Sequence, residues 1–359
     1  MKVITVVGAR PQFVKAAVIS RAFKKAGVEE KIIHTGQHFD HGMSDVFFDE
    51  MEIPKPHFNL GINSMGHGGM TGAMLAGIEE ILLIEKPDAV LVYGDTNSTL
   101  AGALAAKKIH IPIAHIEAGL RSFNMDMPEE VNRILTDRIS TILYAPTQTA
   151  VDNLAKEGYA NFNTVIENAG DVMQDAAYFY AEKASSENGI LENIQHKQFV
   201  LCTLHRAENT DDANRLKNLV DGLNELHKII PVVLPLHPRT AKIIAASGLI
   251  TEFTIIEPVG YFDMIRLLEA CSLVITDSGG LQKEAFFFKK NCVTMRNQTE
   301  WVELVEHGYN VLVGANKQAL LAEAKNMLYK TNDFSKNLYG RGDAGNKIVT
   351  HLLNWFNNK

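Results

Sequence analysis

A glycine-containing turn near residue 280 has the residue types expected of a phosphate-binding site. The apolar run at 273–276 is followed by Ser278, by glycines at 279 and 280, and by Glu284 about one helical turn further on. Glycines let a ligand approach the backbone, and the start of a helix presents N–H groups and the positive end of its dipole. Ser278, Gly279 and Gly280 are therefore predicted to hold a phosphate or diphosphate, with Glu284 placed to accept hydrogen bonds from ribose hydroxyls.

An ordinary helix cap is the alternative for the same segment. Asp277 or Ser278 can cap the helix while the glycines only make the turn. The glycine spacing matches neither the P-loop pattern nor G-x-G-x-x-G, which argues against ATP cleavage and against a standard NAD site.

Two cations follow the first apolar run of the chain, at 3–7. Arg10 can pair with a phosphate through two parallel hydrogen bonds, and Lys15 lies about one helical turn beyond it. We take both as candidate substrate-binding residues, and solvated surface cations are the alternative.

Asp95 and Glu117 each follow a buried apolar run, at 89–93 and 113–116. Two carboxylates at neighbouring strand ends suit general acid and base chemistry, because repulsion and burial can raise one pKa. The alternatives are that Asp95 caps the next helix and that Glu117 pairs with Arg121.

A helix start is indicated by Pro128 followed by Glu129 and Glu130, since proline and acidic residues favour the first turn. This structural reading explains the proline and one acid. It leaves the second acid and Arg133 as candidates, and Glu129 and Arg133 share a helix face at i,i+4.

His205 and His237 are expected at two further strand ends. A histidine titrates near neutral pH and can shuttle a proton or bind phosphate, although a lone histidine is more often structural. The sequence has no H-E-x-x-H, G-x-S-x-G or kinase signature.

The elements that must position these residues alternate along the chain. Short apolar runs without strict alternation indicate strands buried on both faces, at 3–7, 89–93, 113–116, 142–145, 199–203, 232–234 and 273–276. Segments of helical period lie among them, at 13–25, 71–85, 100–108, 214–227 and 264–270. Strands alternating with helices predict doubly wound parallel sheets, whose carboxyl ends face ligands.

Two domains are expected for 359 residues, since domains usually have about 100 to 200 residues. The strand series pauses between about 171 and 197. We therefore predict a first Rossmann-like domain at 1–170, completed by a C-terminal helix at 345–359, and a second at 171–344.

Composition excludes several classes of protein. Hydrophobic residues make up 46% and charged residues 21%, which is globular, and 35 basic against 42 acidic residues give a net charge of −7. A general nucleic-acid or anionic-membrane binder is disfavoured. Three widely spaced cysteines, no signal-peptide core and no apolar run near the 20 residues of a membrane span predict a cytoplasmic protein.

Together these segments resemble the non-hydrolysing UDP-N-acetylglucosamine 2-epimerase family over nearly the whole chain. The resemblance rests on the order and spacing of Gly8-Ala9-Arg10-Pro11 with Lys15, Thr35-Gly36-Gln37-His38, Gly94-Asp95-Thr96, His115-Ile116-Glu117-Ala118-Gly119-Leu120-Arg121, Pro128-Glu129-Glu130 with Asn132-Arg133, His205-Arg206 with Glu208-Asn209, His237-Pro238, Thr276-Asp277-Ser278-Gly279-Gly280 with Glu284, and Thr299-Glu300.

The resemblance implies the glycosyltransferase B type of fold, with two domains facing across a cleft, and a UDP-sugar bound between them. It implies UDP at Ser278, Gly279, Gly280 and Glu284, with Arg10 reaching across, and further substrate contacts from Lys15, Arg133 and His237. It places Asp95, Glu117, Glu129 and His205 at the positions of the catalytic residues. A homodimer is expected, and neither a cofactor nor a metal ion is expected.

The implied chemistry has a physical rationale. The C2 proton of a pyranose is not acidic, because no carbonyl adjoins it. Expelling UDP from C1 while a base takes the C2 proton gives a 2-acetamidoglucal, and UDP adds back after a proton arrives on the other face. Cations and helix-terminal amides stabilise the departing diphosphate.

Two departures from the family pattern bear on the substrate. The usual Thr-Glu-Arg-Pro-Glu run reads Thr299-Glu300-Trp301-Val302-Glu303 here, which is similar to relatives that epimerise modified sugars such as UDP-2,3-diacetamido-2,3-dideoxyglucuronate. The segment at 66–75 lacks an arginine that accompanies an allosteric UDP-N-acetylglucosamine site in some bacterial members, although Gln37 and His38 are retained.

Two other functions compete with epimerisation. A glycosyltransferase of the same fold would use the same nucleotide-binding site. It would also need a groove for an acceptor, and it would need fewer acidic residues in the first domain. A catalytically silent UDP-sugar sensor would bind without exchange, and the four intact candidate catalytic residues argue against it.

Overall fold

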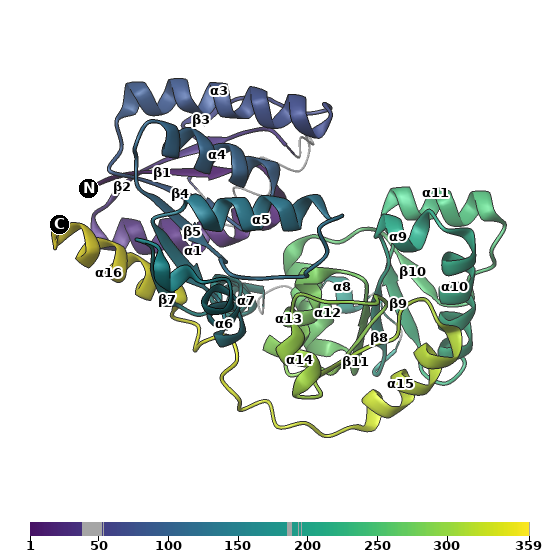
Figure 1. Ribbon diagram of the computed structural model, residues 1–359. Coiled ribbons are helices and arrows are strands. Elements are labelled where there is room, and N and C mark those ends of the chain that lie inside the picture. Colours follow the sequence, from purple (N-terminus) through teal and green to yellow (C-terminus); the bar gives the residue numbers. More distant parts are fainter. Residues whose placement is uncertain (38–51, 53, 185–188, 193, 195, 359) are drawn as a thin grey trace. The chain divides into compact units, whose positions relative to one another are not determined.

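Two compact units make up the protein. The computed structural model describes residues 1–37, 52, 54–184, 189–192, 194 and 196–358. Unit 1 consists of Met1–Ala176 with Asn337–Lys359, and unit 2 consists of Ala177–Lys336 (Figure 1). The C-terminal segment therefore belongs to the same unit as the N-terminus.

Unit 1 is built on a parallel sheet with the strand order β3-β2-β1-β4-β5-β6-β7. Its strands are β1 (Lys2–Val7), β2 (Glu29–His34), β3 (Phe58–Asn59), β4 (Ala89–Tyr93), β5 (Ile113–Ile116), β6 (Ile142–Ala145) and β7 (Val165–Asn168). Tyr93 pairs with Ile116, and Ile116 pairs with Tyr144. This register sets the carboxyl ends of β4, β5 and β6 side by side.

Helices cover both faces of this sheet. They are α1 (Arg10–Ala26), α3 (His67–Glu85), α4 (Asn97–Lys108), α5 (Pro128–Ile139), α6 (Gln148–Lys156), the 3-10 helix η1 (Tyr159–Asn161), α7 (Val172–Ala184) and α16 (Ala344–Asn357). Figure 1 shows α3 and α4 on one face of the sheet and α1 and α16 on the other. The core between β1, β4, α3 and α4 contains Ile4, Val6, Val90, Val92, Met74 and Ile78.

Unit 2 has a second parallel sheet with the order β10-β9-β8-β11-β12-β13. Its strands are β8 (Val200–Thr203), β9 (Val232–Pro235), β10 (Thr254–Ile256), β11 (Leu273–Thr276), β12 (Cys292–Thr294) and β13 (Asn310–Leu312). Its helices are α8 (Gly189–Glu192), α9 (Ala207–Thr210), α10 (Ala213–His227), α11 (Pro238–Ser247), α12 (Tyr261–Ala270), α13 (Gly279–Phe287), α14 (Val302–Glu306) and α15 (Lys317–Tyr329).

The fold class predicted from the sequence is confirmed, because both sheets are parallel and wound with helices. All seven apolar runs form strands and all five helical segments form helices. Strands β2, β3, β7, β10, β12 and β13 were not predicted. They are short or carry charged residues, such as Glu29, Glu30 and Lys31 in β2, and so lack an apolar run.

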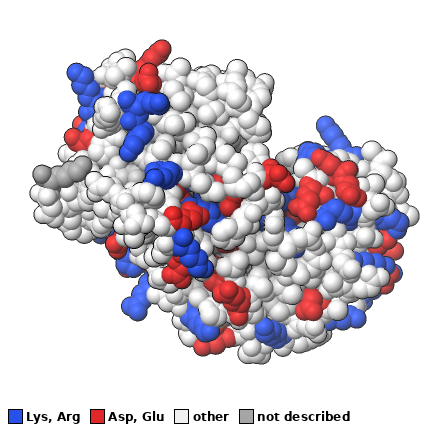
Figure 2. All heavy atoms as spheres, in the orientation of Figure 1, with Lys and Arg blue, Asp and Glu red and all other residues white. Residues whose placement is uncertain are grey.

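The three cysteines lie in the interior of the protein. All three cysteines are free and buried, and burial raises the pKa of the Cys271 and Cys292 thiols to about 12. On the face shown in Figure 2, acidic and basic side chains are interspersed and no broad basic surface is visible.

Across the described ranges of the chain, every helix is too short or too polar to cross a bilayer.

A half-buried aspartate joins the C-terminal helix to the rest of unit 1. Asp175 in α7 accepts hydrogen bonds from the backbone N–H groups of Ala344 (3.1 Å) and Gly345 (2.8 Å) at the start of α16. Burial raises the pKa of the Asp175 carboxyl to about 6, against the effect of these two hydrogen bonds, and the nearby Asp171 and Asp343 raise it further.

The elevated pKa of Asp175 predicts a pH-dependent stability. Aspartate in an unfolded chain has a pKa of about 4, so between about pH 4 and 6 the folded state binds more protons than the unfolded state. Stability from this group is present below about pH 4 and is lost as the pH rises to about 6. Relative to Asp175→Asn, which cannot ionise, the wild-type protein should lose about 1 to 3 kcal/mol of unfolding free energy over that range.

Urea unfolding of both proteins at pH 4.5, 5.5 and 7 measures this difference. Substitution by asparagine also changes the hydrogen bonds to α16, but that effect is independent of pH. A difference between the two proteins that stays constant across the three pH values would contradict the assignment.

Candidate active site

The candidate acids Asp95 and Glu117 follow strands β4 and β5 at turns that each contain one residue of left-handed backbone. Gly94 follows β4 with φ +63°, and Glu117 follows β5 with φ +72°. The Gly94 N–H donates to the Ile116 carbonyl, and the Glu117 N–H donates to the Tyr144 carbonyl. A left-handed conformation costs a non-glycine residue about 1 to 3 kcal/mol, so the neighbouring strands hold Glu117 in place against this strain.

Glu117 forms a buried ion pair with Lys15 of α1. Both side chains are only 9% exposed, and the pair joins Lys15 Nζ to Glu117 Oε2. A Cβ atom on Gly94 would lie 3.2 Å from that oxygen and 3.3 Å from that nitrogen. Lys15 is therefore not a solvated surface cation, and the alternative pair between Glu117 and Arg121 is wrong.

Asp95 pairs with Arg133 of α5. The Asp95 carboxylate is 30% exposed, whereas the Arg133 side chain is 5% exposed. The Asn132 amide donates to the Asp95 carbonyl at 3.0 Å, so α5 holds both the backbone and the side chain of this residue. Thr96 caps α4 by accepting from the Thr99 N–H, and the alternative that Asp95 is the cap is wrong.

The two consecutive glutamates at the start of α5 have different surroundings. Glu130 is fully buried, pairs with Arg133, and accepts hydrogen bonds from the backbone N–H groups of Ser122 (3.0 Å) and Phe123 (2.9 Å). Glu129 is exposed. Glu130 therefore fixes the loop before α5, while Glu129 remains accessible to a substrate.

The backbone amides after β1 are occupied by a side chain of the same loop. Gln12 accepts from the N–H groups of Gly8 (2.8 Å) and Ala9 (3.0 Å) and donates to the Tyr93 carbonyl at 2.7 Å. This residue was not among the predicted site residues, although it lies within the motif that contains them. The side chain of Arg10, and His38, lie outside the described residues.

In unit 2, Asp277 joins the ends of β8 and β11. Its fully buried carboxylate accepts from the backbone N–H groups of His205 (3.1 Å) and Arg206 (3.0 Å) and from the Asn209 amide (3.2 Å). The alternative that Asp277 caps the following helix is therefore wrong. The His205 side chain is 42% exposed, and its Nδ1 atom lies 3.9 Å from Asp277 Oδ1.

The glycine turn forms the N-terminus of α13, as predicted. Ser278 is the N-cap residue and its hydroxyl makes no capping hydrogen bond. A Cβ atom on Gly279 would lie 2.5 Å from Glu300 Oε1 and 3.6 Å from an Arg206 guanidinium nitrogen. Glu284 is buried and accepts a hydrogen bond from the Tyr261 hydroxyl at 3.2 Å. Arg206 and Glu300 therefore lie beside the turn. The sequence indicated these two residues only as members of the motifs that contain them.

Trp301 packs against the same turn. Its indole Nε1–H donates to the Gly279 carbonyl at 3.0 Å, and the Lys283 ammonium lies 4.3 Å from the centre of its ring. Both side chains are buried. A cation at this distance from an aromatic face is attracted to it. Trp301 therefore stabilises the first turn of α13 through contacts with both Gly279 and Lys283.

His237 has a structural contact. It is the N-cap residue of α11, and its Nδ1 atom accepts from the Arg239 N–H at 3.2 Å. Asp95, Glu117 and Glu129 belong to unit 1, while His205 and His237 belong to unit 2 with the glycine turn.

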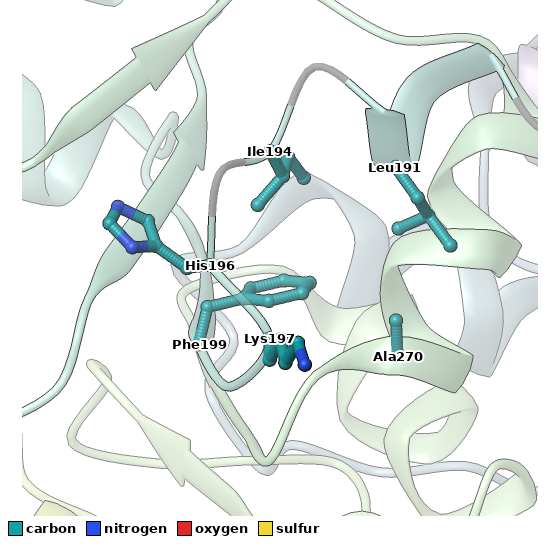
Figure 3. A pocket seen from close by; sticks show the side chains of 6 residues that line it. All are labelled: Leu191, Ile194, His196, Lys197, Phe199 and Ala270. Carbon is teal, nitrogen blue, oxygen red and sulfur yellow. The ribbon is translucent and has the colours of Figure 1, made fainter.

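A separate cavity of about 330 Å³ lies in unit 2, lined by Leu191, Ile194, His196, Lys197, Phe199 and Ala270 (Figure 3). It includes none of the predicted site residues. Among the residues that the structure describes, no three His, Cys, Asp or Glu side chains are grouped as a metal ion would require.

Comparison with known proteins gives consistent results. A family model described as UDP-N-acetylglucosamine 2-epimerase matches residues 21–353. The chain is 57% identical to a UDP-2,3-diacetamido-2,3-dideoxy-D-glucuronate 2-epimerase of Pseudomonas aeruginosa, over 98% of this chain and 99% of the relative. It is 43% identical to a UDP-N-acetylglucosamine 2-epimerase of Methanocaldococcus jannaschii, over 98% of this chain and 99% of that one.

Solved structures agree with these matches. The crystal structure of Methanocaldococcus jannaschii UDP-GlcNAc 2-epimerase in complex with UDP-GlcNAc and UDP has a TM-score of 0.91 at 43% identity, covering 99% of this chain and 100% of that one. The Neisseria meningitidis enzyme bound to UDP-GlcNAc has a TM-score of 0.87 at 31% identity, covering 99% and 100%. These likenesses confirm the predicted glycosyltransferase B type of fold.

The packing around Gly94 predicts a specific loss of stability. Gly94→Ala places a side chain in the left-handed region, which costs about 1 to 2 kcal/mol, and presses it against the Lys15–Glu117 ion pair. Gly61→Ala is the matched control, because Gly61 has φ +62° and nothing lies within 4 Å of its added Cβ. Chemical unfolding should show that Gly94→Ala loses about 1 to 3 kcal/mol more than the control. Equal losses would show that the ion pair does not crowd Gly94.

Proposed function

The chain belongs to the UDP-N-acetylglucosamine 2-epimerase family, and from this premise we propose that it is a non-hydrolysing isomerase that inverts C2 of a UDP-linked N-acetylhexosamine. The observation that carries the proposal is the pair of acids at the adjacent ends of β4 and β5. Asp95 and Glu117 each have a buried cation as partner, Arg133 and Lys15 respectively. Relatives that share the whole length of the chain are named as UDP-sugar 2-epimerases.

The proposed reaction is anti elimination of UDP followed by its re-addition. A base takes the proton from C2, the C2–H electron pair forms the C1–C2 double bond, and UDP leaves with the C1–O pair. A proton then returns to the opposite face of C2 as UDP adds back to C1. No atom or electron is gained or lost overall, so the chemistry requires no redox cofactor.

The catalytic steps are assigned to Asp95, Glu117, Glu129 and His205. Three of these side chains reach solvent to a degree that suits contact with a substrate, since Asp95 is 30% exposed, His205 is 42% exposed and Glu129 is exposed. Glu117 is nearly buried against Lys15. Burial and a fixed cation are the features that separate the proton affinities of neighbouring carboxyl groups.

The nucleotide is assigned to unit 2. Ser278, Gly279 and Gly280 offer an α13 N-terminus at which the Ser278 hydroxyl makes no capping hydrogen bond, and such a helix start suits a diphosphate. Glu284 is assigned to the ribose hydroxyls. Arg10, Lys15, Arg133 and His237 complete the proposed substrate contacts, and Arg206 joins them because it lies beside Gly279.

Two sugars are candidates for the substrate. Interconversion of UDP-N-acetylglucosamine and UDP-N-acetylmannosamine is the activity by which relatives at 42–43% identity are named. The modified uronate UDP-2,3-diacetamido-2,3-dideoxyglucuronate is favoured by the relative at 57% identity. It is favoured also by Trp301, which lies directly against the glycine turn.

The cellular setting is proposed from the same resemblance. We place the protein in the cytoplasm, where its three buried free thiols stay reduced, and we expect a homodimer. A glycosyltransferase activity is the remaining alternative, and it would require an acceptor.

Deuterium exchange tests the proposed reaction. When the protein is incubated in deuterated water with UDP-N-acetylglucosamine or with the diacetamido uronate and no acceptor, the true substrate should acquire one deuterium at C2, seen by mass spectrometry and proton NMR. The sugar that exchanges faster identifies which of the two candidate substrates the protein uses. The proposal is wrong if neither sugar nor any other UDP-N-acetylhexosamine exchanges.

Substitution tests the assigned residues. Asp95→Asn, Glu117→Gln, Glu129→Gln and His205→Gln should each lower turnover by about a hundredfold or more while UDP still binds. Glu29→Gln, on an exposed position at the start of β2, is a control that should retain normal turnover. Near-normal turnover of Asp95→Asn and Glu117→Gln would mean that the acids are misassigned.

A further inference from the structure

A histidine that the proposed mechanism does not use contacts the residue that precedes Asp95 and lies two positions before Glu117 in the chain. His115 is in β5, and its ring is fully buried. Its Nδ1 atom lies 2.7 Å from Asp137 Oδ1, and its Nε2 atom lies 2.7 Å from the Gly94 carbonyl oxygen. The ring therefore connects α5 with the residue that precedes Asp95.

Both partners of the ring accept hydrogen bonds. The Gly94 carbonyl oxygen can only accept, so Nε2 carries a proton. Asp137 also accepts from Arg121 (2.7 Å) and from the Gly119 N–H (3.1 Å). Burial alone would raise the pKa of the Asp137 carboxyl, but the hydrogen bonds and charges of His115 and Arg121 outweigh burial and lower it.

The Asp137 carboxylate already accepts from the Arg121 guanidinium and the Gly119 N–H, so the His115 Nδ1 atom that faces it is placed as a donor as well. A neutral imidazole has one N–H donor and one acceptor nitrogen, and only the imidazolium form donates from both nitrogens. With both nitrogens facing acceptors, the two hydrogen bonds can be made together only by the charged ring.

The surrounding groups balance this charge. Arg121 binds Asp137 and also makes two hydrogen bonds to Glu157, at 2.6 Å and 2.8 Å. The cluster of His115, Arg121, Asp137 and Glu157 thus contains two cations and two anions. Tyr159 and Arg138 lie in the same electrostatic field. Burial raises the pKa of the Tyr159 hydroxyl, Asp137 and Glu157 raise it further, and Arg121 and Arg138 lower it.

We propose that His115 is a positioning residue, held as a buried imidazolium that fixes the Gly94–Asp95 peptide against β5 and so sets the spacing of Asp95 and Glu117. The roles of those two acids rest on the proposed function. The charged ring donates to the last residue before Asp95, and the backbone of His115 leads through Ile116 directly to Glu117. Without the Nε2 donor, the Gly94–Asp95 segment keeps the Gly94 N–H bond to Ile116 but loses the hydrogen bond that fixes its carbonyl oxygen.

The protonation state can be measured in the unmodified protein. In protein labelled with ¹⁵N-histidine at pH 7.5, both ring nitrogens of His115 should carry protons. Through-space contacts to Ala114 and Gly94 identify its signals without any variant. His227 is the internal control, because its Nδ1 atom accepts from the Val232 N–H at 3.0 Å and must lack a proton. A bare nitrogen on His115 at this pH would overturn the inference.

Kinetics of His115→Gln test the positioning role. Glutamine can donate to Gly94 or to Asp137 but does not replace the charged ring, so kcat should fall about tenfold or more while KM changes by no more than about threefold. His227→Gln should leave both values unchanged. An unchanged kcat in His115→Gln would overturn the positioning role.

The outcomes separate this inference from the proposed function. Absence of deuterium exchange by the wild-type protein would reject the epimerase, whatever the state of the His115 ring. Exchange by the wild-type protein together with a neutral His115 ring would reject the positioning role alone. If His115→Gln does not fold, the ¹⁵N measurement still decides the protonation state.

Discussion

The parallel register of β4, β5 and β6 is the constraint on which the candidate site of unit 1 depends. Tyr93, Ile116 and Tyr144 pair across the three strands, so Asp95 and Glu117 leave the sheet at the same edge. The turn after β5 contains Glu117 in a left-handed conformation, which places its side chain against Lys15 of α1. A one-residue shift in register would turn every side chain of a strand to the opposite face, and Glu117 would no longer face Lys15.

Compensation of buried charge is the second requirement, and it explains why so many ionisable residues lie in this region. Lys15, Arg121 and Arg133 are all buried and each contacts one or more carboxylates. Removing one partner of a buried pair leaves an uncompensated charge, at a cost of about 3 to 5 kcal/mol. The acids that are proposed to react therefore lie next to buried ion pairs that stabilise the fold. Glu129 and Glu130 show how closely reactive and structural acids can lie in the chain. Glu129 is exposed, whereas Glu130 is buried and accepts from three donors.

In unit 2, backbone amides instead of cations compensate a buried carboxylate. Asp277 is fully buried, and its carboxylate accepts from the amides that follow β8, so the ends of β8 and β11 are tied together next to the α13 N-terminus. Asp277 is engaged in this way, and the Ser278 hydroxyl makes no capping hydrogen bond to α13. Trp301 contacts the same helix through the Gly279 carbonyl and the Lys283 ammonium. The start of a helix presents backbone N–H groups that suit a diphosphate.

The sequence alone determined the seven strands that are continuous apolar runs, five of the helices and the membership of the motifs. Runs such as 89–93 and 273–276 are buried on both faces. A strand buried in this way is recognisable in the sequence, because all of its neighbouring residues are apolar. The glycine turn at 278–280 is also a local signal, because a helix start and its flexible backbone lie within a few residues. Only the tertiary structure decided which charged residues pair. Lys15 and Glu117 are 102 residues apart in the chain, and the roles of Gln12, Glu130 and Asp277 depend on amides of loops that fold beside them. Spacing along the chain does not specify such partners, because strand order and register bring them together.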